Sequence, residues 1–420
     1  MPQLNLSGIL QFWWLVPLLL SILGLFFSLS IVIPAPNSFL LPLAVATPEI
    51  SPWLICLNLL TLILTVFVHK TWWSALIFIS SLLGLILSLL PLSQLATTNT
   101  NFAVEMETVL GTDYLQTVPE YLKAQMRPQP FVLADIFRGL PEKEVRIQRG
   151  IVFASPDGVD LKLNVYQPLV TQKLQKFPTV VIVYGGAWRQ GSPDKDERFS
   201  CYIAAQGYSV IAIDYRHAPK YKFPAQLEDV RAALQYIQAH GDNLEVDIER
   251  IAIMGRSAGG HLATLAAYEQ GAMPFRAVVS YYAPSDLIEG FRNPPFPNPI
   301  NTNTVLRDFL GGTPDELLEL YQKACPKSYV RPALPPSLLV YAGRDNIVKS
   351  KFGRILYTQL RATGNQAIFL EIPWAKHGFD AVFPGISNQL ALYYTERFLA
   401  SLLYGVISNP VASVSLMDNG

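Results

Sequence analysis

Two glycines flank a serine in the segment Gly-Arg-Ser-Ala-Gly, at positions 255–259. The segment follows a short apolar run at 251–254 and precedes a run of helical composition at 258–269. A sharp turn between a strand and a helix needs glycine on both sides, and it makes the hydroxyl of the central serine project above the sheet. A helix N-cap serine is the alternative interpretation. The order of strand, turn and helix favours Ser257 as a nucleophile.

An acid and a base that could activate this serine follow it in the chain. His377 comes after the last strand-like run, and Asp345 comes after the run before it. Sites built on a strand–turn–helix serine have their serine, acid and histidine in this order. The histidine would accept the serine proton, and the aspartate would hold the imidazole in the required tautomer. Asp286, which follows an earlier strand-like run, is the alternative acid.

A pair of glycines ends the apolar run at 179–184, in the segment Tyr-Gly-Gly-Ala-Trp. Acyl transfer builds an oxyanion, and backbone N–H groups must already point at that oxygen. A glycine turn permits such a close approach of the backbone. We therefore predict oxyanion donors at Gly185, Gly186 or Ala187, together with the N–H of Ala258. Two tryptophans near these segments are predicted to line the acyl pocket, namely Trp188 and Trp374.

Strand-like and helical runs alternate over residues 145–408, which are predicted to form one domain. Continuously apolar strands that alternate with helices predict a mostly parallel sheet with helices on both faces. An insertion at 286–333 contains a proline-rich part that can be neither a central strand nor a helix, and we expect the insertion to cover the site. The predicted strands lie at 145–154, 160–166, 179–184, 208–215, 250–254, 275–282, 337–342 and 366–372.

These motifs together resemble the hormone-sensitive-lipase-like esterases and the related kynurenine-formamidase and isoprenylcysteine-methylesterase groups, over roughly residues 145–404. The resemblance implies an α/β-hydrolase fold. It also implies a carboxylic-ester hydrolase that needs no cofactor and acts on small or medium acyl groups. The segments that carry it are Gly185-Gly186-Ala187-Trp188, Asp214-Tyr215-Arg216-His217-Ala218-Pro219 with Phe223-Pro224-Ala225 and Asp229, and Ser257-Ala258-Gly259-Gly260.

Two positions depart from the pattern of these families. Tyr184 replaces the usual histidine of the oxyanion loop, and we expect its hydroxyl to support the loop by hydrogen bonding. Arg256 replaces the usual acidic residue before the serine, and its charge is expected to favour substrates that carry an anionic group. His261 follows the serine on the same helix. We expect it to pack, because the helix turns it away from the serine hydroxyl.

The first 92 residues are predicted to form a transmembrane region. No Asp, Glu, Lys or Arg precedes Glu49. The apolar runs at 12–33, 52–68 and 72–92 are each near the length that crosses a hydrocarbon core of about 30 Å. They predict three transmembrane helices in an integral, multi-pass membrane protein. The positive-inside rule, applied to Lys70 between the last two runs, puts the N-terminus in the cytoplasm and the large domain outside it.

Residues 93–144 are predicted to connect the membrane region to the large domain. A polar linker is expected at 93–101, and the apolar run at 131–140 suits either an interfacial helix or part of a lid. Residues 409–420 are predicted to form a flexible tail.

Composition excludes several other classes of function. Acidic and basic residues number 32 each, so the net charge is zero. The basic residues form no run in the sequence, and no nucleic-acid partner is expected. Three cysteines are too few for a disulfide framework, and two free thiols are favoured over a Cys201–Cys325 pair. No cluster of cysteine and histidine has metal-ligand spacing, so neither a metal nor a cofactor is predicted.

The sequence thus predicts a membrane-anchored serine hydrolase whose partners are the membrane and a small-molecule or lipid ester. An acyltransferase with the same triad is one alternative, since an alcohol would simply replace water. A catalytically idle membrane receptor or scaffold is the other, because a fold does not dictate a function.

Overall fold

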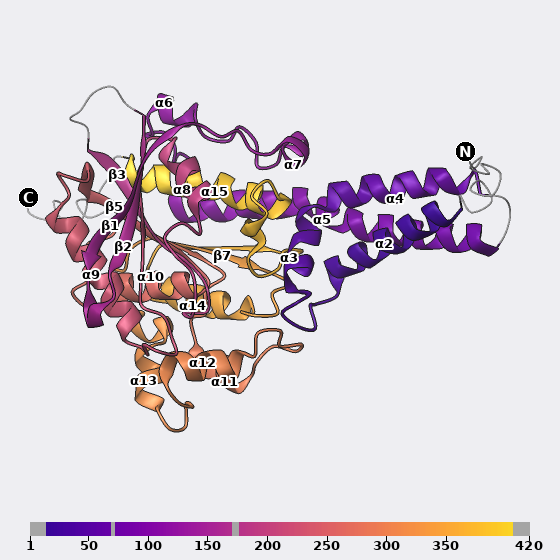
Figure 1. Cartoon of the computed structure of the whole chain (residues 1–420). Helices are drawn as coiled ribbons and strands as arrows, with labels where there is room; N and C mark the ends of the chain where they lie inside the picture. Colours follow the sequence, from indigo (N-terminus) through magenta and orange to yellow (C-terminus); the bar gives the residue numbers. More distant parts are fainter. Residues whose placement is uncertain (1–13, 69–71, 170–175, 406–420) are drawn as a thin grey trace, which may run out of the picture.

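An eight-stranded sheet forms the centre of the larger part of the molecule (Figure 1). The computed structural model describes residues 14–68, 72–169 and 176–405. The strand order is β1-β2-β4-β3-β5-β6-β7-β8. Strand β2 is antiparallel to both of its neighbours, and all other pairs are parallel, which confirms the predicted mostly parallel sheet. The strands are β1 (Val145–Ala154), β2 (Leu161–Pro168), β3 (Phe177–Val183), β4 (Ser209–Ile213), β5 (Val246–Arg256), β6 (Ala277–Tyr281), β7 (Ser337–Ala342) and β8 (Ala367–Ile372).

Helices cover both faces of this sheet. Every residue of β3, β4, β6 and β7 is buried, as expected where an apolar strand is packed on both sides. Alternate residues of each strand enter two separate core clusters. One cluster includes α9 (Ala225–Ala239), α10 (Ala258–Tyr268) and α14 (Lys351–Ala362), and the other includes α8 (Glu197–Ala204) and α15 (Ile386–Leu403).

The predicted insertion forms a small helical layer below the sheet in Figure 1. Its proline-rich segment 293–299 lies between α11 and α12 and contains no helix or strand. Buried apolar residues of α12 join the same core cluster as α10 and α14, so the insertion packs against the sheet's covering helices. Its elements are α11 (Leu287–Arg292), α12 (Thr302–Leu310), α13 (Leu318–Lys323) and the short helix η2 (Pro326–Tyr329).

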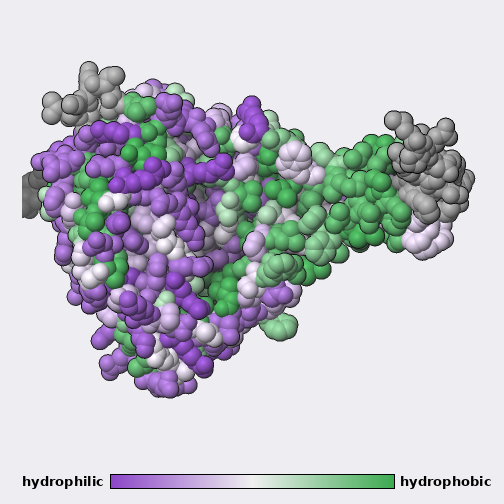
Figure 2. Space-filling model, viewed as in Figure 1, coloured by the Kyte–Doolittle hydropathy of each residue, from purple (hydrophilic) through white to green (hydrophobic). Residues whose placement is uncertain are grey.

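A stalk of three helices projects from this domain. We use the name for α2 (Leu15–Val32), α4 (Ser51–Thr65) and residues 72–92 of α5 (Trp72–Leu110), which run side by side in Figure 1. Figure 2 shows its surface as hydrophobic while most of the domain surface is hydrophilic. Helices α2 and α5 are each long and apolar enough to cross a membrane, and a third span exists only if α4 is counted together with the helix before it.

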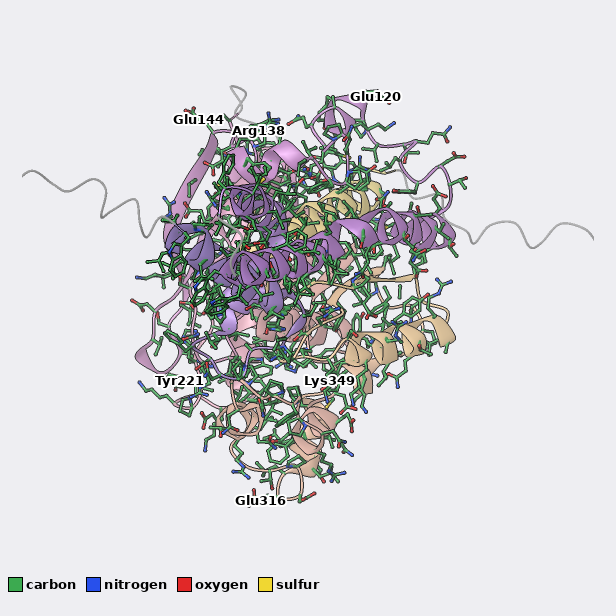
Figure 3. All side chains as sticks on the ribbon, turned by 90° about the vertical axis from the view of Figure 1, so that its right-hand side faces the viewer. Glu120, Arg138, Glu144, Tyr221, Glu316 and Lys349 are labelled. Atoms are coloured by element: carbon green, nitrogen blue, oxygen red, sulfur yellow. The ribbon has the colours of Figure 1, made fainter. Side chains whose placement is uncertain are left out.

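That preceding helix, α3 (Leu41–Glu49), lies where the stalk meets the domain (Figure 1). It makes an angle of 81° with α4. The sequence analysis did not foresee α3 as a helix, because prolines surround it. Lys70, on which the predicted orientation rests, and the predicted tail at 409–420 lie outside the described residues. Figure 3 views the molecule along the stalk and shows charged residues such as Glu120, Glu144 and Glu316 at the edge of the domain.

Small and polar side chains fill the interior of the stalk. The buried amide of Asn58 donates to the hydroxyl of Ser28 at 3.1 Å, and that hydroxyl lies 2.9 Å from the hydroxyl of Ser88. A Cβ atom added at Gly84 would lie 2.4 Å from the amide oxygen of Asn58, and one added at Gly24 would lie 2.6 Å from it. Close packing of small residues with hydrogen bonds between helices is typical of membrane helices.

Helix α5 overturns the predicted linker at 93–101. The helix continues for 39 residues, from the stalk into the domain. It ends where Gly111 takes a φ of 91°, a conformation that glycine adopts without steric cost. Phe102 and Met106 of its second half are buried in the core cluster that contains α15. The polar residues after position 92 therefore mark a change of environment and not the end of the helix.

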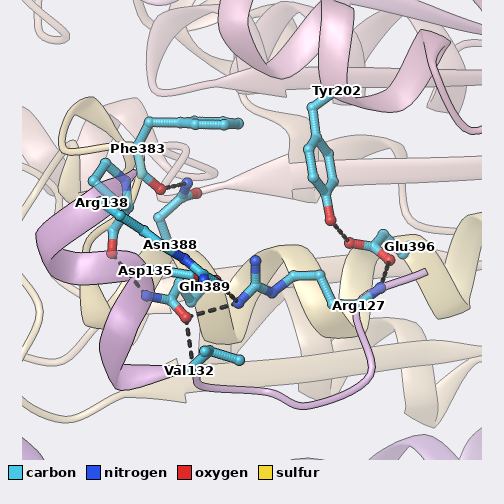
Figure 4. Close-up of polar contacts among 10 residues, drawn as sticks. Arg127, Val132, Asp135, Arg138, Tyr202, Phe383, Asn388, Gln389 and Glu396 are labelled. Atoms are coloured by element: carbon cyan, nitrogen blue, oxygen red, sulfur yellow. Dashed lines mark hydrogen bonds and ion pairs between the residues drawn. The ribbon is translucent and has the colours of Figure 1, made fainter. Parts of the chain in front are cut away.

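The following segment is held against α15 by a polar network (Figure 4). The guanidinium of Arg127 donates to Asp135 at 3.1 Å and to the amide oxygen of Gln389 at 2.7 Å. Short helix α7 (Leu133–Arg138) then contacts the start of α4, where the indole of Trp53 donates to Ile136. This segment lines neither cavity at Ser257, which argues against its use as a lid, and the interfacial alternative stays a prediction.

Candidate active site

Ser257 occupies the sharp turn between β5 and α10. Its backbone has φ 52° and ψ −121°, a conformation that a residue with a side chain rarely adopts. The flanking glycines make the turn possible. A Cβ atom at Gly255 would lie 2.3 Å from the carbonyl of Gly259, and one at Gly259 would lie 2.0 Å from the carbonyl oxygen of Val183. The local geometry is thus that expected of a serine presented above a parallel sheet.

The structure brings Ser257, His377 and Asp345 together in one hydrogen-bonded chain. Nε2 of His377 lies 2.9 Å from Oγ of Ser257, and Nδ1 lies 2.7 Å from Oδ2 of Asp345. The Asp345 carboxylate is fully buried, and its other oxygen accepts the N–H groups of Ile347 and Val348 at 2.7 and 2.8 Å. These bonds fix the carboxylate so that it can orient the imidazole.

The alternative acid, Asp286, does not approach the imidazole. Its carboxylate caps α11 by accepting the N–H of Glu289 at 3.0 Å, and it forms an ion pair with Lys327. These contacts account for its burial, and Asp345 is the carboxylate at His377.

The predicted oxyanion loop lies directly beside Ser257. A Cβ atom added at Gly185 would lie 2.6 Å from the carbonyl oxygen of Arg256, so only glycine permits this approach. Gly186 and Ala187 have φ values of 150° and 54°, and within residues 176–405 their N–H groups have no protein acceptor. The N–H of Ala258 is in the first turn of α10, where a helix has no internal acceptor. These donors border the cavities that contain Ser257.

Lys195 holds this loop in place and was missed by the sequence analysis. Its ammonium donates to the carbonyl oxygen of Gly185 at 2.7 Å. Tyr184 supports the same loop, as predicted: its hydroxyl donates to Asp214 at 2.6 Å, and its ring stacks on Tyr215 with 4.5 Å between the centroids. A tyrosine thus anchors the loop where related families have a histidine.

Arg256 does not offer a free positive charge to the substrate, contrary to our expectation. Its guanidinium is buried, forms an ion pair with Asp380, and lies 3.5 Å from Asp196. Burial acts to lower the pKa of Arg256, but the two carboxylates outweigh it and raise the pKa above its usual value. The charge is therefore neutralised internally, which explains why an arginine is tolerated next to the nucleophile.

A narrow apolar cavity begins at Ser257 and runs under the insertion. Its volume is about 50 Å³, enough for a few non-hydrogen atoms. Trp188 lines it as predicted, and the indole N–H donates to His261 at 3.2 Å. His261 is buried and also bonds Ala324, and burial lowers its pKa to about 4, so it packs as a neutral side chain. The insertion supplies most of the remaining wall: Asp286, Leu287, Gly290, Asn293, Pro295, Ile300, Thr302, Val305 and Leu306.

Trp374 does not line this cavity, so that prediction was wrong. Its side chain is fully buried in the core cluster that contains α15, on the other face of the sheet. The turn between β8 and His377 directs the indole into that core and the imidazole toward Ser257.

A second, wider cavity also reaches Ser257 and His377. Its volume is about 580 Å³. Its lining includes charged residues, among them Asp194 and Arg198. Leu41, from helix α3 beside the stalk, also lines it. The two cavities could therefore hold the two halves of an ester, with the scissile bond at the serine.

Comparison with known proteins agrees with this geometry. Residues 163–360 match the family model described as BD-FAE. Esterase LipC of Mycobacterium tuberculosis is 32% identical over 221 residues, which cover 48% of this chain and 53% of LipC. The probable carboxylic ester hydrolase LipM of the same organism is 27% identical over 238 residues, which cover 54% of each chain. The chain thus spans about half the length of these curated relatives.

Two solved structures support the fold alone. A truncated carbohydrate esterase from gut microbiota superposes with a TM-score of 0.52 at 22% identity, over 62% of this chain and 99% of that one. A bifunctional GH43-CE protein of Bacteroides eggerthii has a TM-score of 0.52 at 24% identity, over 60% and 35% of the two chains. Residues 163–360 of this chain are thus similar to the BD-FAE family, a hormone-sensitive-lipase-like group of α/β-hydrolases.

Proposed function

We propose that this chain is a membrane-anchored serine hydrolase that cleaves carboxylic esters through Ser257, His377 and Asp345. The observation that carries the proposal is the continuous chain of hydrogen bonds from Asp345 through His377 to Ser257, with lengths of 2.7 and 2.9 Å. An idle scaffold would have no need of this arrangement next to unpaired N–H groups and two cavities. The esterase names of the relatives support the same conclusion.

The reaction follows from the positions of these groups. Nε2 of His377 accepts the Ser257 proton as Oγ attacks the ester carbonyl carbon. The carbonyl oxygen becomes an oxyanion that accepts hydrogen bonds from the N–H groups of Gly186, Ala187 and Ala258. The C–O bond to the alcohol then breaks, and the imidazolium returns its proton to the leaving oxygen. Water, deprotonated by His377, attacks the acyl-enzyme and releases the acid.

We assign the two halves of the substrate to the two cavities. The narrow apolar cavity under the insertion receives the acyl group, with Trp188 in its wall. Its small volume favours a short acyl chain. The wider cavity receives the alcohol. A second alcohol in that cavity would make the enzyme an acyltransferase, and adding one to the assay distinguishes the two activities.

The stalk forms the membrane anchor in this proposal. Its surface is apolar, while small and polar side chains make up much of its interior, a distribution typical of membrane helices. Helix α4 has 15 residues, or about 22 Å at about 1.5 Å per residue, so it crosses only a locally thin core. Three spans would put the N-terminus and the domain on opposite sides of the membrane. The orientation predicted from Lys70 then makes the domain extracytoplasmic. Residues 1–92 then form the anchor, residues 93–144 connect it, and residues 145–408 form the catalytic domain.

Hydrolysis of p-nitrophenyl esters by the detergent-solubilised protein tests the enzymatic part of the proposal. Wild type should hydrolyse acetate and butyrate esters faster than decanoate. Ser257→Ala should abolish turnover, whereas Ser155→Ala, which changes an exposed serine bonded to Asp160, should leave it unchanged. Wild type without activity toward any ester, and without labelling by a fluorophosphonate, would contradict the proposal and favour the idle scaffold.

A further inference from the structure

The loop that carries the catalytic base is hydrogen-bonded to the C-terminal end of the stalk helix α2. Lys376 immediately precedes His377, and its ammonium donates to the carbonyl oxygens of Ser30 and Ile33. The bond to Ile33 is 2.7 Å long. Both acceptors belong to the C-terminal end of α2, whose last carbonyl groups have no partner within the helix. A lysine near these carbonyls also interacts favourably with the helix dipole.

The loop that carries the catalytic acid reaches the same place. The side chains on either side of Asp345 both contact backbone carbonyls that end or follow α2. The guanidinium of Arg344 donates to Val32 at 3.3 Å, and the amide of Asn346 donates to Ala35 at 3.3 Å. The neighbours of the acid and of the base therefore hold one short segment, 30–35, between them.

The two loops are also bonded to each other, so the contact acts on them as a unit. The backbone N–H of Arg344 donates to the carbonyl of Ala375 at 2.9 Å. Lys376 is almost fully buried in this junction. Burial, with a smaller contribution from Arg344, lowers its pKa to about 8. Such a buried amine must keep its acceptors, because an unpaired one would be costly.

Helix α3 adds a second contact between the stalk and the domain. The buried carboxyl of Glu49 accepts the N–H of Ser387 at 2.8 Å, at the start of α15. A Cβ atom added at Gly385 would lie 2.6 Å from an oxygen of that carboxyl. Two elements of the membrane region thus dock on the domain beside the active site, and the position of α2 relative to the triad is fixed.

We infer that the C-terminal end of α2 positions the catalytic acid and base, with Lys376, Arg344 and Asn346 as the positioning residues. The inference rests on the proposed function, because it assigns these residues a role in that reaction. It makes the anchor a component of the active site as well as an attachment. When the bonds are intact, His377 and Asp345 keep the alignment that proton transfer requires. When they are lost, the loops relax and turnover falls.

Turnover per active site in the full chain tests this inference. Wild type, Lys376→Met, Lys376→Arg and Arg344→Met are reconstituted in phosphatidylcholine nanodiscs, and active sites are counted by complete reaction with a fluorophosphonate. We expect Lys376→Met to lower kcat for p-nitrophenyl acetate by about tenfold, since a displacement near 1 Å costs up to about 10²-fold. KM should change by less than about twofold. Lys376→Arg should recover most of the rate, because it restores donors.

Two control variants distinguish a loss of active-site alignment from a loss of folded protein. Lys123→Met removes a lysine that pairs with Glu120 on the surface, and its kcat should equal that of wild type. Arg344 is exposed at the junction, so Arg344→Met tests the same contact even if Lys376→Met does not fold. An active wild type with unchanged kcat in every foldable variant of Lys376 and Arg344 would overturn the inference alone. An inactive wild type would overturn the proposed function and the inference with it.

Discussion

The stalk and the α/β domain differ in the side chains that they bury and expose. In the stalk, Ser28, Asn58 and Thr61 are fully buried while Leu19, Ile63 and Ile79 are more than half exposed. In the domain, the strands are apolar inside and most charged residues lie at the surface (Figures 2 and 3). This difference is the one expected if the stalk lies in lipid, as we propose, and the domain lies in water. Water drives apolar groups inward, whereas lipid gives them no reason to leave the surface, and packing and hydrogen bonds hold the helices together.

Glycine serves both regions, but for different reasons. Gly84 and Gly24 lie against Asn58, which allows three helices to approach closely. Gly255 and Gly259 instead relieve crowding in the turn that presents Ser257. The first pair stabilises an assembly of helices, and the second pair permits chemistry.

Asp345→Asn should lower kcat by about 10⁴-fold, because an amide no longer selects the imidazole tautomer that can accept the serine proton. The thermal stability of the stalk should not change. Steady-state kinetics, with thermal unfolding in detergent as a control for folding, measures both. Loss of less than about tenfold would assign the role of the acid to another group.

Gly84→Leu should destabilise the stalk by about 1–3 kcal/mol, because the added side chain overlaps Asn58 and forces the helices apart. Thermal unfolding in detergent checks this, with Ile86→Leu as the matched change on the exposed face of the same helix. Equal unfolding temperatures for the two variants would mean that the helices do not pack through Gly84.

Lys195→Met should lower kcat about tenfold, since the oxyanion loop loses the bond that holds the carbonyl of Gly185 and its donors become less well placed. KM should change little. Lys162→Met, on the exposed side of β2, provides the comparison. The two variants are compared by initial rates with p-nitrophenyl acetate, and equal rates would show that the loop needs no such support.

The smallest effect concerns pH and the junction of the two regions. Lys376 has a pKa of about 8 in the folded protein against an ordinary value of 10.5. The unfolded chain therefore binds the proton more tightly, and the free energy of unfolding should rise between pH 8 and pH 10.5. Unfolding temperatures of wild type minus those of Lys376→Met should increase over this range. A constant difference would mean that the lysine is not buried at the junction.

Much of the domain was predictable because its signals are local. Each predicted strand overlaps an observed one, since a run that is apolar on both faces has few other ways to be buried. The serine turn, the oxyanion loop, the acid and the base follow strands whose ends meet at one edge of the sheet, and the predicted residues lie together there. Trp374 was assigned wrongly because its position after a strand does not reveal which way its side chain points.

The junction was not predictable, because its contacts join residues more than 300 positions apart, such as Lys376 and Ser30. The only feature of the sequence that pointed to Lys376 was its position next to His377. The linker prediction failed because polarity was taken as the end of a helix, although a helix ends at a cap such as Gly111. The role of Arg256 was misjudged because its partner Asp380 lies far along the chain.

Trapping the acyl-enzyme shows directly which residue is the nucleophile. The membrane-reconstituted protein is mixed with p-nitrophenyl acetate, quenched in acid within the first turnover, and mapped by peptide mass spectrometry. The expected result is an acetyl group on Ser257 that is absent from Ser257→Ala. Acetyl label at another residue, or hydrolysis that continues in Ser257→Ala, would contradict it.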